Sequence, residues 1–291
     1  MNTTQPAAEN FGGVAAAMPD FGEVLRRYGG APPPTPVVVG PGIPGAAPLD
    51  AGFSTRATTI LAFKFNGGVL VAGDRRATAG NLVVYDRADK VLEIDRYSLM
   101  AIAGVPATAW EMARMLEHSF QFYRRSQLQE LSMEGKVRAL SRLLRENLGL
   151  AMQGVGVVVP LFAAYDVEAG LPRLYFYDVM GAQFEVTDFA ASGSGSPSVR
   201  AVIQYANAYG ARPLIKMDEE EALLLALRAL DTAAQNDTAT GGVDRHGRIY
   251  PIVKIVSSRG IDTLPEAVLS KAYQRDLQSL PKNTLSLVEA L

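Results

Sequence analysis

The chain has 291 residues, enough for one large domain or two small ones. Its formal net charge of −2 gives no support for a nucleic-acid-binding surface, and no apolar run is long enough to cross a membrane. Cysteine is absent, which excludes disulfides, thiolate metal sites and cysteine nucleophiles together. The N-terminus lacks the basic and apolar regions of a secretory signal, so we expect a cytoplasmic protein.

Residues 1–57 differ in composition from the rest of the chain. Their Pro- and Gly-rich part, GGAPPPTPVVVGPGIPGAAP, cannot form a continuous helix or an interior strand, and it predicts a flexible tether. Ahead of it, Phe21 and Leu25 share one helical face, which Asp20 can cap and Gly29 can end. One interpretation is a short amphipathic helix on a leader, and the other is a disordered tail.

From Thr58 onward the chain contains β-rich runs separated by turn signals. Asn66-Gly67 between two such runs is a strong hairpin signal, and Ala169-Gly170 marks another turn. We predict strands over residues 58–65, 69–76, 90–94, 97–104, 154–168, 172–179, 182–186 and 188–195, and a last hairpin over 248–262.

Apolar residues at helical spacing predict helices between these strands. We predict helices over residues 106–125, 133–153, from 196 onward, 217–235 and 264–280. Strands and helices therefore come in blocks rather than alternating singly. This order argues against a doubly wound parallel sheet and favours antiparallel sheets with helices layered outside.

The two histidines are poor candidates for catalysis. His118 lies in an amphipathic run and His246 in the loop-like segment VDRHGR, so both are predicted to be solvated. A Ser-His-Asp enzyme therefore has few candidates for its base. We expect any catalysis to use a hydroxyl group with another base.

Thr58 offers such a hydroxyl. If the chain is cut before Thr58, this residue holds a hydroxyl beside a free α-amine, whose unperturbed pKa is about 7.7–8.0. The amine can then take the hydroxyl proton, which is a known way to activate a threonine nucleophile. The alternative is that Thr58 is an ordinary strand residue, since threonine favours strands.

A set of motifs surrounds Thr58. The segment ATTILAFKFNGGVLVAGDRRATAGNLVVYDRADKV (residues 57–91) opens with Ala-Thr-Thr. A GG hairpin, an A-G-D-x-R block and a lysine on a following strand come next, and the AIAG at 101–104 makes an A-G turn into a helix. This set closely resembles the opening of proteasome β-subunits, and the match extends from Thr58 to about Ile261. It is most similar to the actinobacterial type of bacterial proteasome, a family of N-terminal-threonine peptidases. That family also has a leader helix of the F-x-x-x-L-R-R kind, like residues 21–27 here.

The resemblance implies an α+β fold, the four-layer αββα sandwich of N-terminal-nucleophile (Ntn) hydrolases, with two antiparallel sheets face to face and helix pairs outside. Residues 1–57 would be a propeptide that is removed on maturation. Residues 58–291 would be the proteasome β domain with a C-terminal helical extension.

The resemblance also assigns catalytic roles. Thr58 matches the nucleophile, Lys90 the lysine that stabilises its alkoxide, and Asp74 the acidic residue that pairs with this lysine. We expect the three to lie on three different strands that converge. Gly104 matches the glycine whose N–H forms the oxyanion hole. From the residues alone, an ordinary salt bridge is the favoured interpretation of Asp74 and Lys90.

Two distal motifs agree with these roles. Ser194, in ASGSG, matches a serine that forms a hydrogen bond near the terminal amine. NDTATGG (residues 236–242) resembles the family's D-x-x-[ST]-G-G, in which Asp237 and Thr240 would orient that amine. Alone, DTATGG is only a polar loop after a helix.

The first substrate pocket can be mapped by the same resemblance. Small residues leave room and apolar walls favour cleavage after large apolar residues, although any of these residues can equally belong to the core. The pocket positions are Ala77, Ala88, Leu92, Ile102, Pro106 and Trp110.

One residue departs from the family pattern. The processing site, Ala57 and Thr58, has alanine where the family usually has glycine before the nucleophile. The extra methyl group restricts the strained turn through which Thr58 would attack its own preceding carbonyl. Ala57 therefore predicts slower processing, or a subunit that is never processed.

The resemblance implies partners and no metal or organic cofactor. The partners are α-subunit rings, other β-subunits in stacked seven-membered rings (α7β7β7α7), a regulatory ATPase ring, and protein substrates tagged by a prokaryotic ubiquitin-like protein. Two alternatives stay open: a non-catalytic, unprocessed ring subunit, and an N-terminal-threonine amidase that acts on small molecules.

Overall fold

The computed structural model describes residues 58–79, 82–154, 156–244 and 249–277. Every described residue lies within the unit Asp50–Leu291. The leader predicted over residues 1–57, Ala57 and His246 lie outside the described residues. The boundary between a propeptide and a mature domain therefore stays a prediction.

The first sheet is antiparallel throughout and runs in the order β10-β1-β2-β11-β12. Its strands are β1 (Thr59–Phe65), β2 (Gly68–Gly73), β10 (Phe189–Gly193), β11 (Ile252–Ser257) and β12 (Gly260–Thr263). β1 and β2 form the hairpin that Asn66-Gly67 predicts. Next to this turn, Gly68 has a φ of +151°, and a Cβ there would lie 2.1 Å from the carbonyl oxygen of Val256. Glycine is therefore needed for β2 to approach β11.

The second sheet is also antiparallel and follows sequence order, β5-β6-β7-β8-β9. Its strands are β5 (Val91–Asp95), β6 (Ser98–Ala101), β7 (Leu161–Asp166), β8 (Leu171–Tyr177) and β9 (Gln183–Glu185). Asp166 caps the turn between β7 and β8 by accepting the Ala169 N–H at 3.1 Å. The turn predicted at Ala169-Gly170 is thus confirmed.

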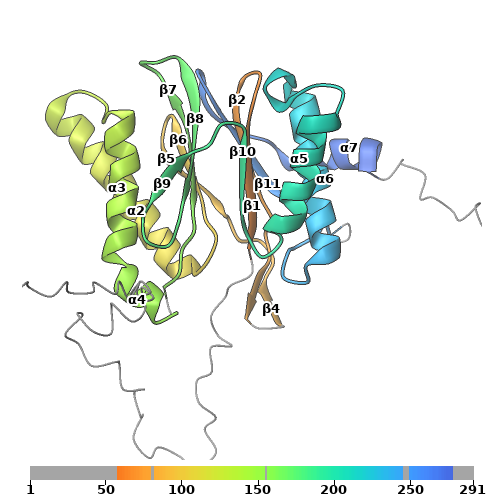
Figure 1. The fold of residues 1–291 in the computed structure, drawn as a ribbon, viewed down its shortest axis with the longest axis horizontal. Coiled ribbons are helices and arrows are strands. Elements are labelled where there is room, and N and C mark those ends of the chain that lie inside the picture. Colours follow the sequence, from red (N-terminus) through yellow and green to blue (C-terminus); the bar gives the residue numbers. More distant parts are fainter. Residues whose placement is uncertain (1–57, 80–81, 155, 245–248, 278–291) are drawn as a thin grey trace, which may run out of the picture. The chain divides into compact units, whose positions relative to one another are not determined.

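Helices cover the outer face of each sheet. α2 (Pro106–Gln127) and α3 (Met133–Glu146) lie outside the second sheet, and α5 (Ser196–Tyr209) and α6 (Glu219–Asn236) lie outside the first (Figure 1). Shorter elements follow them: α4 (Leu148–Met152), the 3-10 turn η2 (Leu214–Lys216), α7 (Glu266–Ala272) and the π turn η3 (Tyr273–Leu277). The predicted four-layer αββα arrangement with two antiparallel sheets is confirmed.

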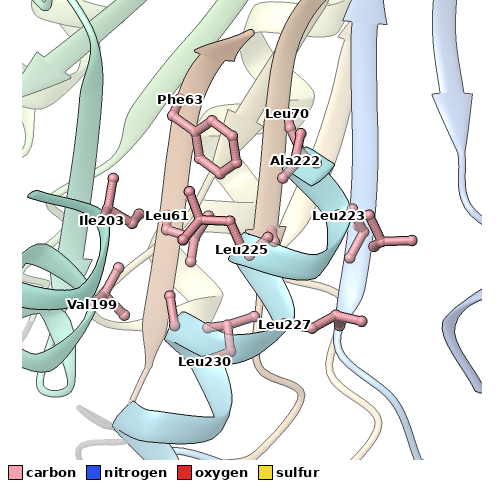
Figure 2. Close-up of a cluster of buried hydrophobic side chains, with 14 of the residues drawn as sticks. Leu61, Phe63, Leu70, Val199, Ile203, Ala222, Leu223, Leu225, Leu227 and Leu230 are labelled. Carbon is pink, nitrogen blue, oxygen red and sulfur yellow. The ribbon is translucent and has the colours of Figure 1, made fainter. Parts of the chain in front are cut away.

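Three hydrophobic clusters separate the four layers. β1 supplies two of them because successive side chains of a strand point to opposite faces. Leu61 and Phe63 pack against α5 and α6, as Figure 2 shows, whereas Ile60 and Ala62 pack between the sheets. The third cluster fills the space between the second sheet and α2 and α3. β1 is thereby buried on both faces, which fixes its N-terminal end.

Two predicted helices differ from the observed ones. The helix predicted over 133–153 is broken, because α3 ends at Glu146 and the side chain of Asn147 instead binds the carbonyl of Gly156. The helix predicted from residue 217 begins at Glu219. There Asp218 accepts the Glu221 N–H at 2.9 Å and donates its own N–H to the Glu221 carboxylate, forming a capping box.

The structure adds to or changes the strand predictions at three places. The strand predicted from residue 154 begins only at Leu161. The neighbouring runs at 182–186 and 188–195 became β9 and β10, which belong to different sheets. A small hairpin, β3 (Ala77–Ala79) and β4 (Leu82–Tyr85), was not predicted, because every residue of β4 is exposed and shows no alternation.

Candidate active site

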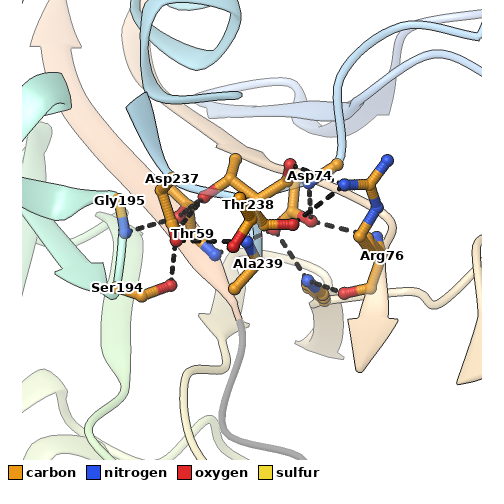
Figure 3. Close-up of polar contacts among 11 residues, drawn as sticks. Thr59, Asp74, Arg76, Ser194, Gly195, Asp237, Thr238 and Ala239 are labelled. Atoms are coloured by element: carbon orange, nitrogen blue, oxygen red, sulfur yellow. Dashed lines mark hydrogen bonds and ion pairs between the residues drawn. The ribbon is translucent and has the colours of Figure 1, made fainter. Parts of the chain in front are cut away.

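Asp74 is the fixed point of the candidate site. It directly follows β2 and its side chain is fully buried. One carboxylate oxygen accepts the Thr59 N–H at 2.8 Å and the Lys90 ammonium at 2.7 Å. The other oxygen accepts the N–H groups of Arg76 and Gly241, both at 2.9 Å. Four donors from four parts of the chain therefore hold this carboxylate in one orientation (Figure 3).

Lys90 lies beside Asp74, immediately before β5. Its ammonium also donates to the carbonyl of Arg76 at 2.6 Å. Burial lowers the pKa of Lys90 below its ordinary value, and the charge of Asp74 opposes this shift. Among the described residues these contacts use two of the three ammonium hydrogens, which leaves one for a further acceptor.

Thr58 is buried and directly precedes β1. Its carbonyl accepts the N–H of Ser194 at 3.0 Å. Gly193, on β10, has a φ of +95°, and a Cβ there would lie 1.6 Å from the Thr58 carbonyl oxygen. Thr58, Asp74 and Lys90 thus lie at strand ends that meet, so the prediction that they lie on three different strands was wrong in detail.

A second polar group lies around Asp237, which ends α6. One of its carboxylate oxygens accepts the hydroxyls of Ser194 and Thr240, both at 2.6 Å, and the other accepts the Ala239 N–H at 3.1 Å. Burial opposes ionisation of Asp237, but these hydrogen bonds outweigh it and place the pKa of Asp237 below its ordinary value. The structure therefore brings together the three distal residues that the motifs single out.

Comparison with known proteins identifies the family. A family model described as "Proteasome subunit" matches residues 54–247, about two thirds of the chain. The chain belongs to the proteasome subunit family. It is 43% identical over 209 residues to proteasome subunit beta 2 of Thermomonospora curvata, covering 72% of each chain.

Two further relatives show the same similarity. Proteasome subunit beta of Acidimicrobium ferrooxidans is 39% identical over 253 residues, 87% of each chain, and that of Streptomyces griseus is 40% identical over 223 residues, 76% of each chain. The resemblance to actinobacterial proteasome β-subunits is thereby confirmed. Within the part of this proteasome subunit that the structure describes, no helix is long and apolar enough to cross a membrane.

Gly104 has a structural reason to be glycine. Its φ is +117°, and a Cβ would lie 2.0 Å from the Val157 carbonyl oxygen, where the chain makes an isolated bridge with Val158. This close approach alone requires glycine. The oxyanion role of Gly104 therefore stays a prediction.

The six pocket positions of the proteasome subunit are only partly brought together. Leu92 and Trp110, which is 42% exposed, line a cavity of about 390 Å³ that is also lined by Glu93 and Lys254. Ala88 and Ile102 are buried and do not line it, and Ile102 packs in the core under α2. Ala77 opens β3 and Pro106 opens α2, and both are partly buried. The pocket assignment stays a prediction.

Sequence reasoning missed Thr59, Arg76, Gly195 and Gly241. Thr59 lies at the centre of Figure 3, and its hydroxyl oxygen is 2.6 Å from that of Thr240. The signals were present, since these residues adjoin Thr58, Asp74, Ser194 and Thr240 inside the quoted motifs. They act mainly through backbone groups or glycine geometry, which residue type alone does not reveal. Among the described residues, no group of three or more His, Cys, Asp or Glu side chains could hold a metal ion.

Proposed function

We propose that this chain is the catalytic β-subunit of a bacterial proteasome, an N-terminal threonine endopeptidase that is made as a zymogen and activated by cutting before Thr58. The observation that carries the proposal is the buried pair of Lys90 and Asp74 at the ends of the strands that adjoin Thr58. A structural subunit needs no buried ammonium at this place. Burying two charges costs desolvation free energy, and a buried ion pair adds little net stability to a fold. Its presence at this place therefore favours a chemical role.

The chemistry follows from the groups at the site. Once the bond before Thr58 is cut, the α-amine of Thr58 accepts the proton of its own hydroxyl, directly or through a water molecule. The Lys90 ammonium stabilises the alkoxide, which attacks a peptide carbonyl. The protonated α-amine then returns its proton to the nitrogen of the cleaved bond, and the amine half of the substrate leaves. Water then hydrolyses the ester on Thr58 and restores the hydroxyl. The Gly104 N–H would stabilise the oxyanion in both steps.

The same acyl transfer accounts for autocatalytic activation. The Thr58 hydroxyl would attack the carbonyl of Ala57 while a water molecule takes its proton. The amide bond then breaks, which frees the Thr58 amine with that proton and leaves residues 1–57 as an ester on the Thr58 oxygen. Water hydrolyses this ester, which releases residues 1–57 and restores the hydroxyl. Ser194, Asp237 and Thr240 would hold that amine. Leu92, which lines the cavity beside Trp110, would favour large apolar residues before the cleaved bond.

The proposed setting is a ring-shaped chamber in the cytoplasm. The subunit would form stacked rings with other β-subunits and with α-subunits. A regulatory ATPase ring would supply unfolded proteins, including those tagged by a prokaryotic ubiquitin-like protein. This part of the proposal rests on the relatives, which are named as proteasome β-subunits.

Two other functions would use the same fold. A ring subunit that is never processed is favoured by Ala57, and a small-molecule amidase would share Thr58 as nucleophile. Co-expression with the α-subunit separates all three. The mass and N-terminal sequence of the chain are measured, together with cleavage of an unfolded protein and of short peptides.

We expect a chain that begins at Thr58 and cleaves unfolded protein inside the assembly. A Thr58→Ala variant is the control and should retain residues 1–57. A wild-type chain that still begins at Met1 would refute the catalytic proposal. A processed chain that neither assembles with α-subunits nor cleaves protein would favour the amidase.

A further inference from the structure

Thr59 joins the two polar groups of the site, and the proposed chemistry gives it no role. Its N–H donates to the Asp74 carboxylate at 2.8 Å, and its carbonyl accepts the Asp74 N–H at 3.1 Å. The two peptide groups that flank the Cα of Thr59 are thus both bound to Asp74, the partner of Lys90. Because Thr59 is fully buried, water cannot replace these contacts.

The hydroxyl of Thr59 points into the second polar group, and its direction follows from hydrogen counting. The Asp237 carboxylate only accepts, so Thr240 uses its single hydroxyl hydrogen to donate to Asp237 at 2.6 Å. The 2.6 Å contact between the two threonine hydroxyls must therefore be filled by the hydrogen of Thr59. The Gly195 N–H donates to the Thr59 hydroxyl oxygen at 3.0 Å. Each link in this chain points toward Asp237.

The backbone leaves room for this hydroxyl pair. A Cβ on Gly195 would lie 2.6 Å from the hydroxyl oxygens of both Thr59 and Thr240. Real Cβ atoms essentially never make contacts that short. Gly195 therefore packs directly against the hydroxyls of Thr59 and Thr240, and a displacement of one of the three groups would move the other two.

We infer that Thr59 is a positioning residue, whose hydroxyl holds Thr240 and Asp237 in the orientation that receives the α-amine of Thr58. This inference rests on the proposed function, since only a processed chain has that amine. The alternative is a buried hydroxyl that merely satisfies two neighbours, as most buried polar groups do. That alternative predicts a loss of stability and no change in the amine.

Charged groups around the network make the amine a sensitive probe. Thr59 contacts the Asp74–Lys90 pair through its N–H and reaches Asp237 through the Thr240 hydroxyl. Arg76 donates to the carbonyls of Thr238 and Thr240 at 3.0 and 3.3 Å. Loss of the Thr59 hydroxyl removes the donor that polarises Thr240 and so weakens the hydrogen bond to Asp237. The Asp237 carboxylate is then less neutralised by hydrogen bonds, and it stabilises the protonated form of the Thr58 amine more strongly. The pKa of the Thr58 amine should rise.

The test compares Thr59→Val, Thr59→Ser and a control, Ser141→Ala, in the full chain assembled with α-subunits. Ser141→Ala removes a hydroxyl that donates to Gln183 at 2.9 Å on the other side of the fold. Residues 54–57 are replaced in all chains by a factor Xa site, so that exposure of Thr58 does not depend on self-processing. Labelling of the Thr58 amine by acetic anhydride is followed against pH by mass spectrometry, and kcat and KM are measured on a fluorogenic peptide.

We expect Thr59→Val to raise the pH of half-maximal labelling by about half a unit to one unit. Its kcat should fall about 10- to 100-fold with KM unchanged, because the amine is misplaced and the substrate contacts are not. Thr59→Ser should restore both values, and Ser141→Ala should leave both unchanged.

Wild-type labelling and kcat in a folded, cut Thr59→Val chain would overturn the inference. A wild-type chain with a free Thr58 amine and no peptidase activity would instead refute the proposed function. The labelling curve would then still decide whether Thr59 controls the amine. The two failures are therefore distinguishable.

Discussion

Asp74 and Lys90 form a buried ion pair, and the two residues differ in how many hydrogen bonds each keeps when the other is replaced. Without Lys90, the Asp74 carboxylate still accepts three backbone N–H groups, from Thr59, Arg76 and Gly241. Without the Asp74 charge, the Lys90 ammonium keeps only the carbonyl of Arg76 among the described residues. An asparagine at position 74 would also place its amide NH2 group against N–H groups that now donate to the Asp74 carboxylate.

This asymmetry gives the first prediction. Asp74→Asn should lower the unfolding free energy by about 3–5 kcal/mol, the usual cost of stranding a buried charge. Lys90→Met should cost clearly less, while both variants lose peptidase activity. Urea unfolding at a fixed subunit concentration measures the difference. The control is Arg142→Met, which breaks an exposed helix pair with Glu146 and should cost about 0.3–0.5 kcal/mol. Equal losses for both site variants would contradict the argument.

Asp237 gives a prediction on pH. Its folded pKa lies below the ordinary value, because the hydrogen bonds from Ser194 and Thr240 outweigh burial. Its carboxylate therefore stabilises the fold fully above the unfolded pKa of about 3.9, and this contribution is lost as pH falls through the lower folded pKa.

The unfolding free energy of wild type should accordingly exceed that of Asp237→Asn by a constant amount near neutral pH. The gap should shrink below about pH 4. Urea unfolding of both chains over a pH series tests this. A gap that widens on acidification would mean that the carboxylate is not stabilised by its hydrogen bonds.

At the scale of elements, the junction of β1 and β10 positions Thr58. Gly193→Ala would place a methyl group against the Thr58 carbonyl, in a backbone region that favours glycine. We expect loss of processing before Thr58 and a lower unfolding temperature. The control is Gly149→Ala in α4, where a Cβ meets nothing within 4 Å, and this change should stabilise by about 0.4–1 kcal/mol. Normal processing of Gly193→Ala would show that β1 and β10 can separate without effect.

Elements with strong periodicity were predictable, and those set by single side chains were not. α2 was predicted over 106–125 and spans Pro106–Gln127, because its apolar residues recur at helical spacing. The break after α3 depends on one hydrogen bond of Asn147 to a distant carbonyl. Likewise, β9 and β10 are adjacent in sequence but join different sheets, a choice made by tertiary pairing.

The site shows the same division. Thr58, Asp74, Lys90, Ser194, Asp237 and Thr240 were predicted through motif resemblance, and the structure places them in two linked networks. Thr59 and Gly195 were missed, since their importance lies in a hydroxyl direction and an absent Cβ. Such features exist only once the chain is folded.

For the whole described domain, burial predicts which strands unfold locally least often and so exchange their amide hydrogens most slowly. β1 and β2 lie between two hydrophobic clusters and are buried along almost their whole length. β9 and β4 lie at sheet edges with exposed side chains. Hydrogen exchange followed by mass spectrometry should therefore find the slowest amides in β1 and β2 and fast ones in β9 and β4. Slower exchange in β9 than in β1 would contradict this order.

The Asp74–Lys90 pair is already formed in the uncut chain, while the nitrogen of Thr58 is still an amide. The lone pair of an amide nitrogen is delocalised into the carbonyl and does not accept a proton. Under the proposed function the precursor therefore lacks the base of the processed subunit, although the Asp74–Lys90 pair is in place. Activation would need one bond to break and no element to move. Because hydrolysis of the ester releases residues 1–57, switching the subunit on would be irreversible.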